Sequence, residues 1–346
     1  RYLFTLLRTA LAASAFLKNR LDLTEKIQGG GYIVQAIVLI ALCITPGAKV
    51  WYVGAAGLVA AIWIFVCSYL VKRRLTPELL FQKAYVSVKT IGEIVKTGIW
   101  SSINELGNVL NSGLDLIITE AMLSPEVLGQ IAIAKQFSTV CAAIIGKICS
   151  SYRPQLLQYY ASREKEQIKV TMIRGMKLCT LFCTLVISVF AACGKAFLQL
   201  WIPGQDIDFI FAASMIAIMG DILPGIVNPL YYSYTMAKKV KVPCFVTVGM
   251  GIANLASMYI LIKTTHLGGY AVLFTTLVIN MVHFIDAPLY STYCLKMKWS
   301  TFYPMIFKCL TVSGLGIAGG LFASRFFPAT ISWIRLIALV FVTTVI

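Results

Sequence analysis

Long apolar runs separated by short polar connections cover almost the whole of this 346-residue chain. A helix of about 20 apolar residues is long enough to cross the hydrocarbon core of a bilayer. Eleven such runs can be placed, at 2–17, 31–46, 52–71, 94–119, 127–150, 173–200, 207–235, 243–262, 269–291, 304–324 and 331–346. The pattern predicts an all-α, polytopic bundle of about 11 membrane-spanning helices, in which short connections make neighbours antiparallel.

The stretch 92–120 differs from the other runs because polar residues recur in it at steps of three and four. On a helix these positions form one stripe: Ser101, Asn104, Glu105, Asn108, Asn111, Ser112 and Asp115. A carboxylate at the middle of a lipid-facing helix costs about 2.5–3.5 kcal/mol or more. The stripe should therefore face protein or water, either as a buried seam between helices or as the wall of a transport cavity.

Composition supports a membrane protein and excludes several other classes. The chain is 59% hydrophobic and 13% charged, whereas soluble domains carry about 25% charged residues. Its ten cysteines form no C-x-x-C pair, and there are two histidines. We therefore expect the cysteines to be small buried apolar residues, with no metal site and no cofactor. No ATP-binding P-loop and no Ser/His/Asp set occurs, so we expect a transporter and not an enzyme.

The net charge of +16 is unevenly distributed, because Lys and Arg concentrate in alternate connections. These cations are Lys18, Arg20, Lys26, Lys72, Arg73, Arg74, Lys83, Lys89, Arg153, Arg163, Lys165, Lys169, Lys238, Lys239, Lys241, Lys296 and Lys298. The positive-inside rule places these connections in the cytoplasm. Residue 1 then lies outside, which predicts an odd number of spans before it and a chain cut at its front.

The basic segment 72–91 predicts a cytoplasmic linker between two helical lobes. Residues 1–71 would be the remainder of a truncated first lobe, 92–291 the second lobe, and 292–346 two additional helices. We also expect 151–172 to be a long loop with a short helix on the membrane surface. Gly316 and Gly320 form a G-x-x-x-G, which predicts close helix packing.

Four cations lie inside or at the edge of apolar runs: Arg8, Lys135, Lys147 and Arg153. Arg8 and Lys135 sit deeper in their runs, and a cavity lined by such cations would suit a phosphate or pyrophosphate. Lys147 and Arg153 can equally extend to the inner headgroups.

Two other runs carry polar groups and prolines. Asp221 is followed by Pro224 and Pro229, which predict a bent or broken helix that could serve as a hinge, or a plain kink. His283 and Asp286 are three residues apart, within reach on a helix. They are either a proton-relaying pair or a satisfied polar pair.

Several segments together resemble the polysaccharide-biosynthesis flippases, the O-antigen or repeat-unit (Wzx-type) flippases of the multidrug/oligosaccharidyl-lipid/polysaccharide exporter superfamily. The longest is TGIWSSINELGNVLNSGLDLIITEAMLSPEVLGQIAIAKQF, Thr97–Phe137. Others are NRLDLTEKI, SSYRPQLLQYYASREKEQI, LQLWIPGQD and MAKKVKVP. The resemblance covers nearly the whole chain and implies that three family helices precede run 2–17.

The resemblance implies a two-lobed transporter of the bacterial inner membrane that acts by alternating access. Its cargo would be an undecaprenyl-pyrophosphate-linked oligosaccharide, moved from the cytoplasmic to the outer leaflet. Expected partners are this lipid, the bilayer, and the polymerase and chain-length proteins of polysaccharide assembly. We expect a monomer and no nucleic acid.

Depth and helix face, and not the family, suggest the individual roles. Phosphate would meet Arg8, Lys135, Lys147 and Arg153; sugar hydroxyls would meet Asn104, Asn108, Asn111 and Ser112; ion or proton coupling would fall to Glu105, Asp115, Asp221 or His283. One alternative is a cation-coupled multidrug exporter, which would want an acidic or aromatic cavity. Another is a membrane enzyme or scaffold subunit of polysaccharide assembly.

Overall fold

A computed structural model describes residues 2–18, 20–44, 49, 51–78 and 87–326 of the chain. These residues form helices and turns with no strand among them. The chain divides into two compact units, Arg1–Ile91 and Gly92–Ile346. The predicted all-α, polytopic membrane bundle is confirmed.

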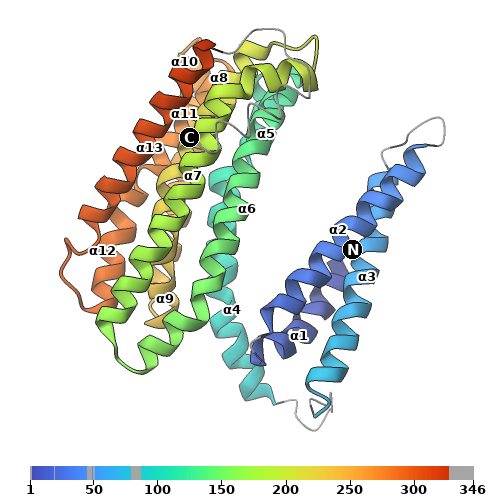
Figure 1. Ribbon diagram of the computed structural model, residues 1–346, viewed down its shortest axis with the longest axis vertical. Coiled ribbons are helices and arrows are strands. Elements are labelled where there is room, and N and C mark those ends of the chain that lie inside the picture. The colour runs from blue at the N-terminus through green and yellow to red at the C-terminus, as the bar shows by residue number, and fades with distance from the viewer. Residues whose placement is uncertain (1, 19, 45–48, 50, 79–86, 327–346) are drawn as a thin grey trace. The chain divides into compact units, whose positions relative to one another are not determined.

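The first unit is built from three helices, α1 (Tyr2–Leu17), α2 (Leu21–Cys43) and α3 (Trp51–Leu75) (Figure 1). Large apolar side chains such as Leu6 and Ile37 are exposed on them, as expected of surfaces that face lipid. α3 ends in Lys72, Arg73 and Arg74, which begin the basic segment predicted to be a linker. Residues 79–86 of that segment lie outside the described residues.

The second unit begins with α4 (Val88–Asn108), whose first turn crosses the boundary between the units. The elements that follow are a π-helical turn (Val109–Gly113), α5 (Asp115–Met122), α6 (Pro125–Ala161), α7 (Lys165–Trp201), α8 (Ile207–Val227), a 3-10 turn (Asn228–Tyr231), α9 (Tyr232–Met236), α10 (Lys241–Thr264), α11 (Gly269–Asn280), α12 (His283–Leu295), α13 (Tyr303–Ala323) and a last 3-10 turn (Ser324–Phe326).

Eight helical stretches of the described chain are long and apolar enough to cross a membrane. They correspond to eight of the eleven predicted runs. Of the other three, run 2–17 is the shorter apolar helix α1. Run 94–119 is not continuous, because a π-helical turn separates α4 from α5. Run 331–346 lies outside the described residues.

The expectation of a long loop at 151–172 is wrong. α6 and α7 have 37 residues each, and only 162–164 separate them, with Arg163 in the left-handed conformation at φ 60°. A 37-residue helix is about 55 Å long, against about 30 Å of hydrocarbon core. The polar residues around this turn therefore continue the two helices beyond the apolar layer.

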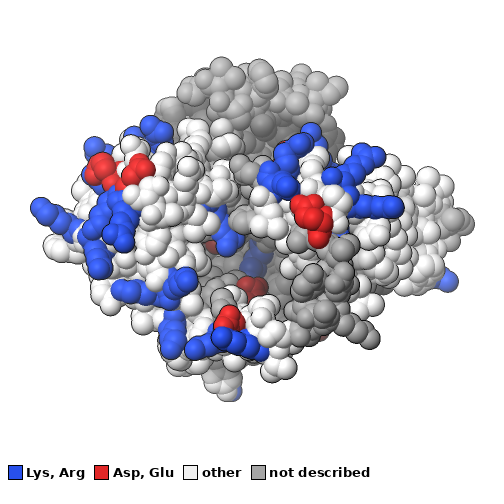
Figure 2. Space-filling model, turned by 90° about the horizontal axis from the view of Figure 1, so that it is seen from below, with Lys and Arg blue, Asp and Glu red and all other residues white. Residues whose placement is uncertain are grey.

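Basic and acidic turns of the second unit lie at opposite ends. Lys165 Nζ reaches the carbonyl of Lys296 at 3.5 Å, and Tyr290 donates to the carbonyl of Lys239 at 3.1 Å. These contacts bring together the turns after α6, α9 and α12, and Figure 2 shows Lys and Arg gathered on the corresponding face. At the other end the Phe209 and Tyr270 rings meet with centroids 4.7 Å apart, near Asp206 and Asp208. This arrangement agrees with the orientation that the positive-inside rule predicts.

The main core of the second unit lies among α6, α7, α8 and α13, around side chains such as Met176, Ile218 and Phe302. α13 packs closely on α7 at the predicted G-x-x-x-G. A Cβ added at Gly320 would lie 2.4 Å from the carbonyl oxygen of Ser188. The small residues therefore allow close approach of the two helices, and this bundle is the scaffold for the cavity described next.

Candidate functional site

A cavity of about 610 Å³ opens within the second unit. It is lined by residues of α4, the π-helical turn, α8, the 3-10 turn, α9, α10, α11 and α12. Eight residues that the sequence marked as site candidates line it: Asn104, Glu105, Asn108, Asn111, Ser112, Asp221, Pro224 and His283. The polar stripe of 92–120 therefore forms a cavity wall over Ser101–Ser112. Beyond the π-helical turn the stripe is buried between helices, so each of the two interpretations holds for one part of it.

The stripe becomes a buried seam after Ser112. Asp115 is completely buried, does not line the cavity, and forms an ion pair with Lys135 of α6. Lys135 also donates to the carbonyl oxygen of Ser112 at 2.8 Å. Oδ1 of Asp115 is buried and has no hydrogen-bond partner within the described chain. Lys135 thus neutralises a buried carboxylate and holds the end of the π-helical turn.

Asparagines from two other helices hold the cavity side of this turn. Asn254 of α10 is fully buried and donates to the carbonyl oxygen of Asn111 and, at 3.2 Å, to Oγ1 of Thr276. Asn111 donates to Oδ1 of Asn280 at 3.0 Å, and Asn280 donates to the carbonyl oxygen of Gly220 at 3.1 Å. The network ties the π-helical turn to α8, α10 and α11. Asn254 in run 243–262 and Asn280 in run 269–291 were the available sequence signs, and the predicted site did not include them.

The second wall of the cavity comes from the proline-containing segment. After Pro224, α8 ends at Val227 and the chain makes a 3-10 turn, so the predicted interruption of this helix is observed. Pro229 is buried, and its Cγ would be 3.0 Å from a Cβ placed on Gly175 of α7. Pro224 lines the cavity and Pro229 packs behind it. The hinge role of both prolines stays a prediction.

Hydrogen bonds orient the acidic groups of the lining. Asp221 accepts from the hydroxyl of Ser138 on α6, a partner the sequence did not indicate. Asn108 donates to Glu105 at 3.3 Å, one turn along α4. His283 Nδ1 lies 3.1 Å from Asp286 Oδ1, and the Tyr231 ring meets the imidazole edge-on, with centroids 5.7 Å apart.

The cavity lining is acidic and aromatic. Glu105, Asp221 and Asp286 contribute carboxylates, and Trp100, Tyr231 and Tyr234 contribute rings. Among the described residues that line it, none is Lys or Arg. Carboxylates accept hydrogen bonds and attract cations, so the lining suits hydroxyl-bearing or cationic groups better than phosphate.

None of the three predicted phosphate-binding cations of the second unit lines this cavity. Lys135 is paired with Asp115, and Lys147 and Arg153 are exposed on α6 and do not line the cavity. Arg8 belongs to the first unit, where it lines a separate pocket of about 180 Å³. The phosphate role of these residues stays a prediction.

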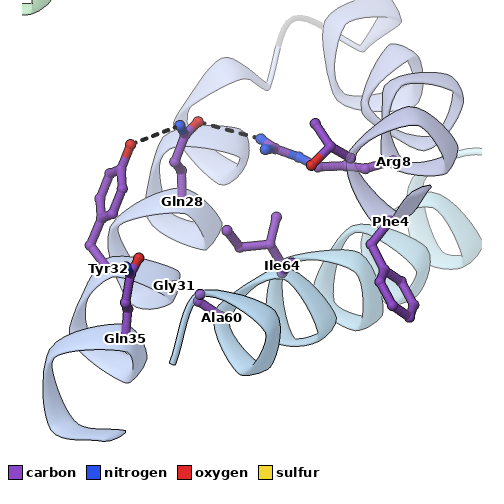
Figure 3. Close-up of a pocket in the computed structure, with 11 residues that line it drawn as sticks. Phe4, Arg8, Gln28, Gly31, Tyr32, Gln35, Ala60 and Ile64 are labelled. Atoms are coloured by element: carbon purple, nitrogen blue, oxygen red, sulfur yellow. Dashed lines mark hydrogen bonds between the residues drawn. The ribbon is translucent and has the colours of Figure 1, made fainter. Parts of the chain in front are cut away.

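Figure 3 shows the pocket around Arg8, between α1, α2 and α3. Arg8 donates to Oε1 of Gln28 at 3.4 Å, and Gln28 donates to the hydroxyl of Tyr32 at 3.2 Å. The Arg8 guanidinium is therefore the first group in a series of hydrogen bonds that runs from α1 to α2 between apolar side chains. No acidic partner of Arg8 is seen in the described part of this unit.

The cysteines behave as the sequence predicts for small apolar residues. Eight of the ten are buried. Over the described ranges, no group of three or more His, Cys, Asp or Glu side chains could hold a metal ion.

Comparison with known proteins finds a membrane relative. The chain is 26% identical over 278 residues to the uncharacterized membrane protein EpsK of Bacillus subtilis (strain 168). The match covers 78% of this chain and 54% of that protein, so the chain spans about half the length of this curated relative. No family model matches the chain, and no solved structure matches it. The similarity and the eight apolar helical stretches agree on a multi-pass membrane protein.

Proposed function

We propose that this chain belongs to a flippase of the bacterial inner membrane that moves an undecaprenyl-pyrophosphate-linked oligosaccharide from the cytoplasmic to the outer leaflet by alternating access. The observation that carries the proposal is the cavity of about 610 Å³ inside an otherwise apolar bundle. Its amides and carboxylates offer hydrogen-bonding groups that match sugar hydroxyls. A cavity of this size holds a small sugar unit, and the lipid would remain in the bilayer.

The interrupted helices fit this role. Broken helices that line a cavity recur in secondary transporters, where they can move between inward-open and outward-open states. Here the π-helical turn and the 3-10 turn both border the cavity. Glu105, Asp221 and His283 line the cavity, which supports a role for them in binding the coupling cation or proton, whereas Asp115 is paired with Lys135. The Arg8 pocket remains the best candidate for a phosphate contact.

The proposal is tested by deleting the full gene and following lipid-linked oligosaccharide. We expect the lipid-linked repeat unit to accumulate on the cytoplasmic side and surface polysaccharide to fall. Complementation should fail with Asn104→Leu, which fills the cavity wall, and succeed with Ser102→Leu, at a position two residues away that does not line it. Normal polysaccharide without accumulation, in a strain that lacks other flippases, would contradict the proposal.

A cation-coupled exporter of the same superfamily is the second candidate, and the acidic, aromatic lining favours it. Carboxylates and rings attract organic cations. This function predicts that cells producing the protein expel a cationic dye, and that Asp221→Asn abolishes the efflux. Dye retention equal to that of cells without the protein would exclude this alternative.

A further inference from the structure

Tyr231 presents a hydroxyl to the cavity region without a partner. The oxygen is buried and makes no hydrogen bond within the described chain. The residue lines the cavity, and its ring is held against the His283 imidazole. Buried hydroxyls are nearly always hydrogen-bonded, to protein, water or ligand. This hydroxyl therefore lacks a partner that a molecule bound against Tyr231 could supply.

The local backbone explains why Tyr231 and Asn228 lie together at the cavity. In a 3-10 helix, side chains three residues apart lie directly above one another. The turn Asn228–Tyr231 is of this kind, and both of its end residues line the cavity. An amide and a phenol hydroxyl are thus presented together. Trp100 of α4 lines the same cavity and supplies an aromatic surface.

The charges around this group are negative or balanced. Asp286 is bonded to His283 on α12, and Glu105 and Asp221 line the same cavity. Of the nearby cations, Lys135 pairs with Asp115. Lys241 lies over the Trp100 ring at 5.4 Å and does not line the cavity. A carboxylate entering here would meet like charges in a medium that screens poorly.

We infer that Asn228, Tyr231, His283 and Asp286 form a sugar subsite that accepts a neutral or amino pyranose and rejects a uronic acid. The inference rests on the proposed function and names the sugar class of its cargo. The hydroxyls of the sugar would bond Tyr231, Asn228 and Asp286, and a protonated amine would be attracted by the carboxylates.

The first test uses the purified protein in detergent and ligand-observed saturation-transfer NMR. The probes are the methyl glycosides of N-acetylglucosamine, glucosamine and glucuronate, each titrated separately. We expect the neutral and amino sugars to bind at least about tenfold more tightly than glucuronate, since one like-charge contact at low dielectric is worth that factor. Equal or tighter binding of glucuronate, or no binding of any probe, would overturn the subsite.

The second test uses matched Tyr→Phe variants. Tyr231→Phe keeps the ring and loses the hydroxyl, and should weaken N-acetylglucosamine binding by about three- to tenfold, as expected for one hydrogen bond. Tyr259→Phe, on an exposed face of α10 away from the cavity, should bind as the unmodified protein does. Unchanged binding by a folded Tyr231→Phe protein would refute the assignment. If that variant misfolds, the probe selectivity of the unmodified protein still decides.

The outcome separates this inference from the proposed function. Accumulation of lipid-linked oligosaccharide on gene deletion, together with a preference for glucuronate, would leave the flippase and remove the subsite. Binding of the neutral sugar without accumulation on deletion would keep the subsite and remove the flippase.

Discussion

Two helices of the second unit are interrupted where they border the cavity, and they are interrupted for different reasons. Between α8 and α9 the cause is local, because Pro224 and Pro229 each remove a backbone donor and crowd the preceding turn. Between α4 and α5 there is no proline. The π-helical turn Val109–Gly113 is instead held by side chains from α6 and α10. The break between α8 and α9 is caused by prolines of that segment itself, whereas the π-helical turn between α4 and α5 depends on contacts with other helices.

The largest expected effect comes from separating Lys135 and Asp115. Lys135→Met leaves a fully buried carboxylate without its counter-ion, which should cost about 3–5 kcal/mol of stability. The measurement is the thermal midpoint of the detergent-solubilised protein. The double variant Lys135→Met/Asp115→Asn should recover most of the loss, because it removes both charges.

The same double variant examines the phosphate role of Lys135. If it is stable and transports fully, Lys135 serves the fold and not the cargo. A stable double variant that fails to transport would instead support contact with an anionic group. A double variant as unstable as Lys135→Met would show that the loss does not come from the unpaired carboxylate, and would attribute it to the lost bond from Lys135 to the Ser112 carbonyl.

A smaller loss is expected where α10 crosses the π-helical turn. A Cβ on Gly251 would lie 2.6 Å from Cβ of Leu110 and 2.9 Å from the carbonyl oxygen of Gly107. Gly251→Ala should therefore cost about 1–3 kcal/mol through overpacking. Gly249→Ala is the matched control, because a Cβ there meets nothing within 4 Å. Equal thermal midpoints for the two variants would show that the crossing is not tight.

Removing the asparagine that bonds the turn should have a comparable or slightly smaller effect. Asn254→Leu loses the bonds to the Asn111 carbonyl and to Thr276, at about 1 kcal/mol each. Amide exchange followed by mass spectrometry should show faster exchange in 108–115 than in the unmodified protein. Unchanged exchange there would mean that the turn is set by its own sequence.

Of the variants considered, a substitution at the proline break should change stability least and transport most. Pro229→Ala restores a backbone donor and is expected to shift stability by no more than about 1 kcal/mol. Transport should fall, because Asn228 and Tyr231 would no longer share one side of a 3-10 turn. The readouts are the thermal midpoint and the lipid-linked oligosaccharide assay. Full transport would leave the prolines as a simple kink.

The same contrast explains what the sequence could and could not predict. Spans, their antiparallel order and the proline break follow from periodicity, length and local sterics, and the alternation of Lys and Arg indicates which turns share an end. The π-helical turn did not follow, because Asn254 and Lys135 are 143 and 23 positions from Asn111 and Ser112, to which they bond. The stripe left open a buried seam or a cavity wall, and the structure shows that its residues line a cavity as far as Ser112. The stripe gave no sign that Asp115 would be buried against a lysine.

The hairpin of α6 and α7 would convert a small rotation near the cavity into a larger displacement at its tip. Each helix is about 55 Å long, so about 25 Å extends beyond a hydrocarbon core of about 30 Å. A rotation of about 10° in the cavity wall would displace the tip by about 4 Å over that length. The tip residues 162–164 are thus a place where small movements around the cavity can be measured from the aqueous side, for example by a spin label at Ser162.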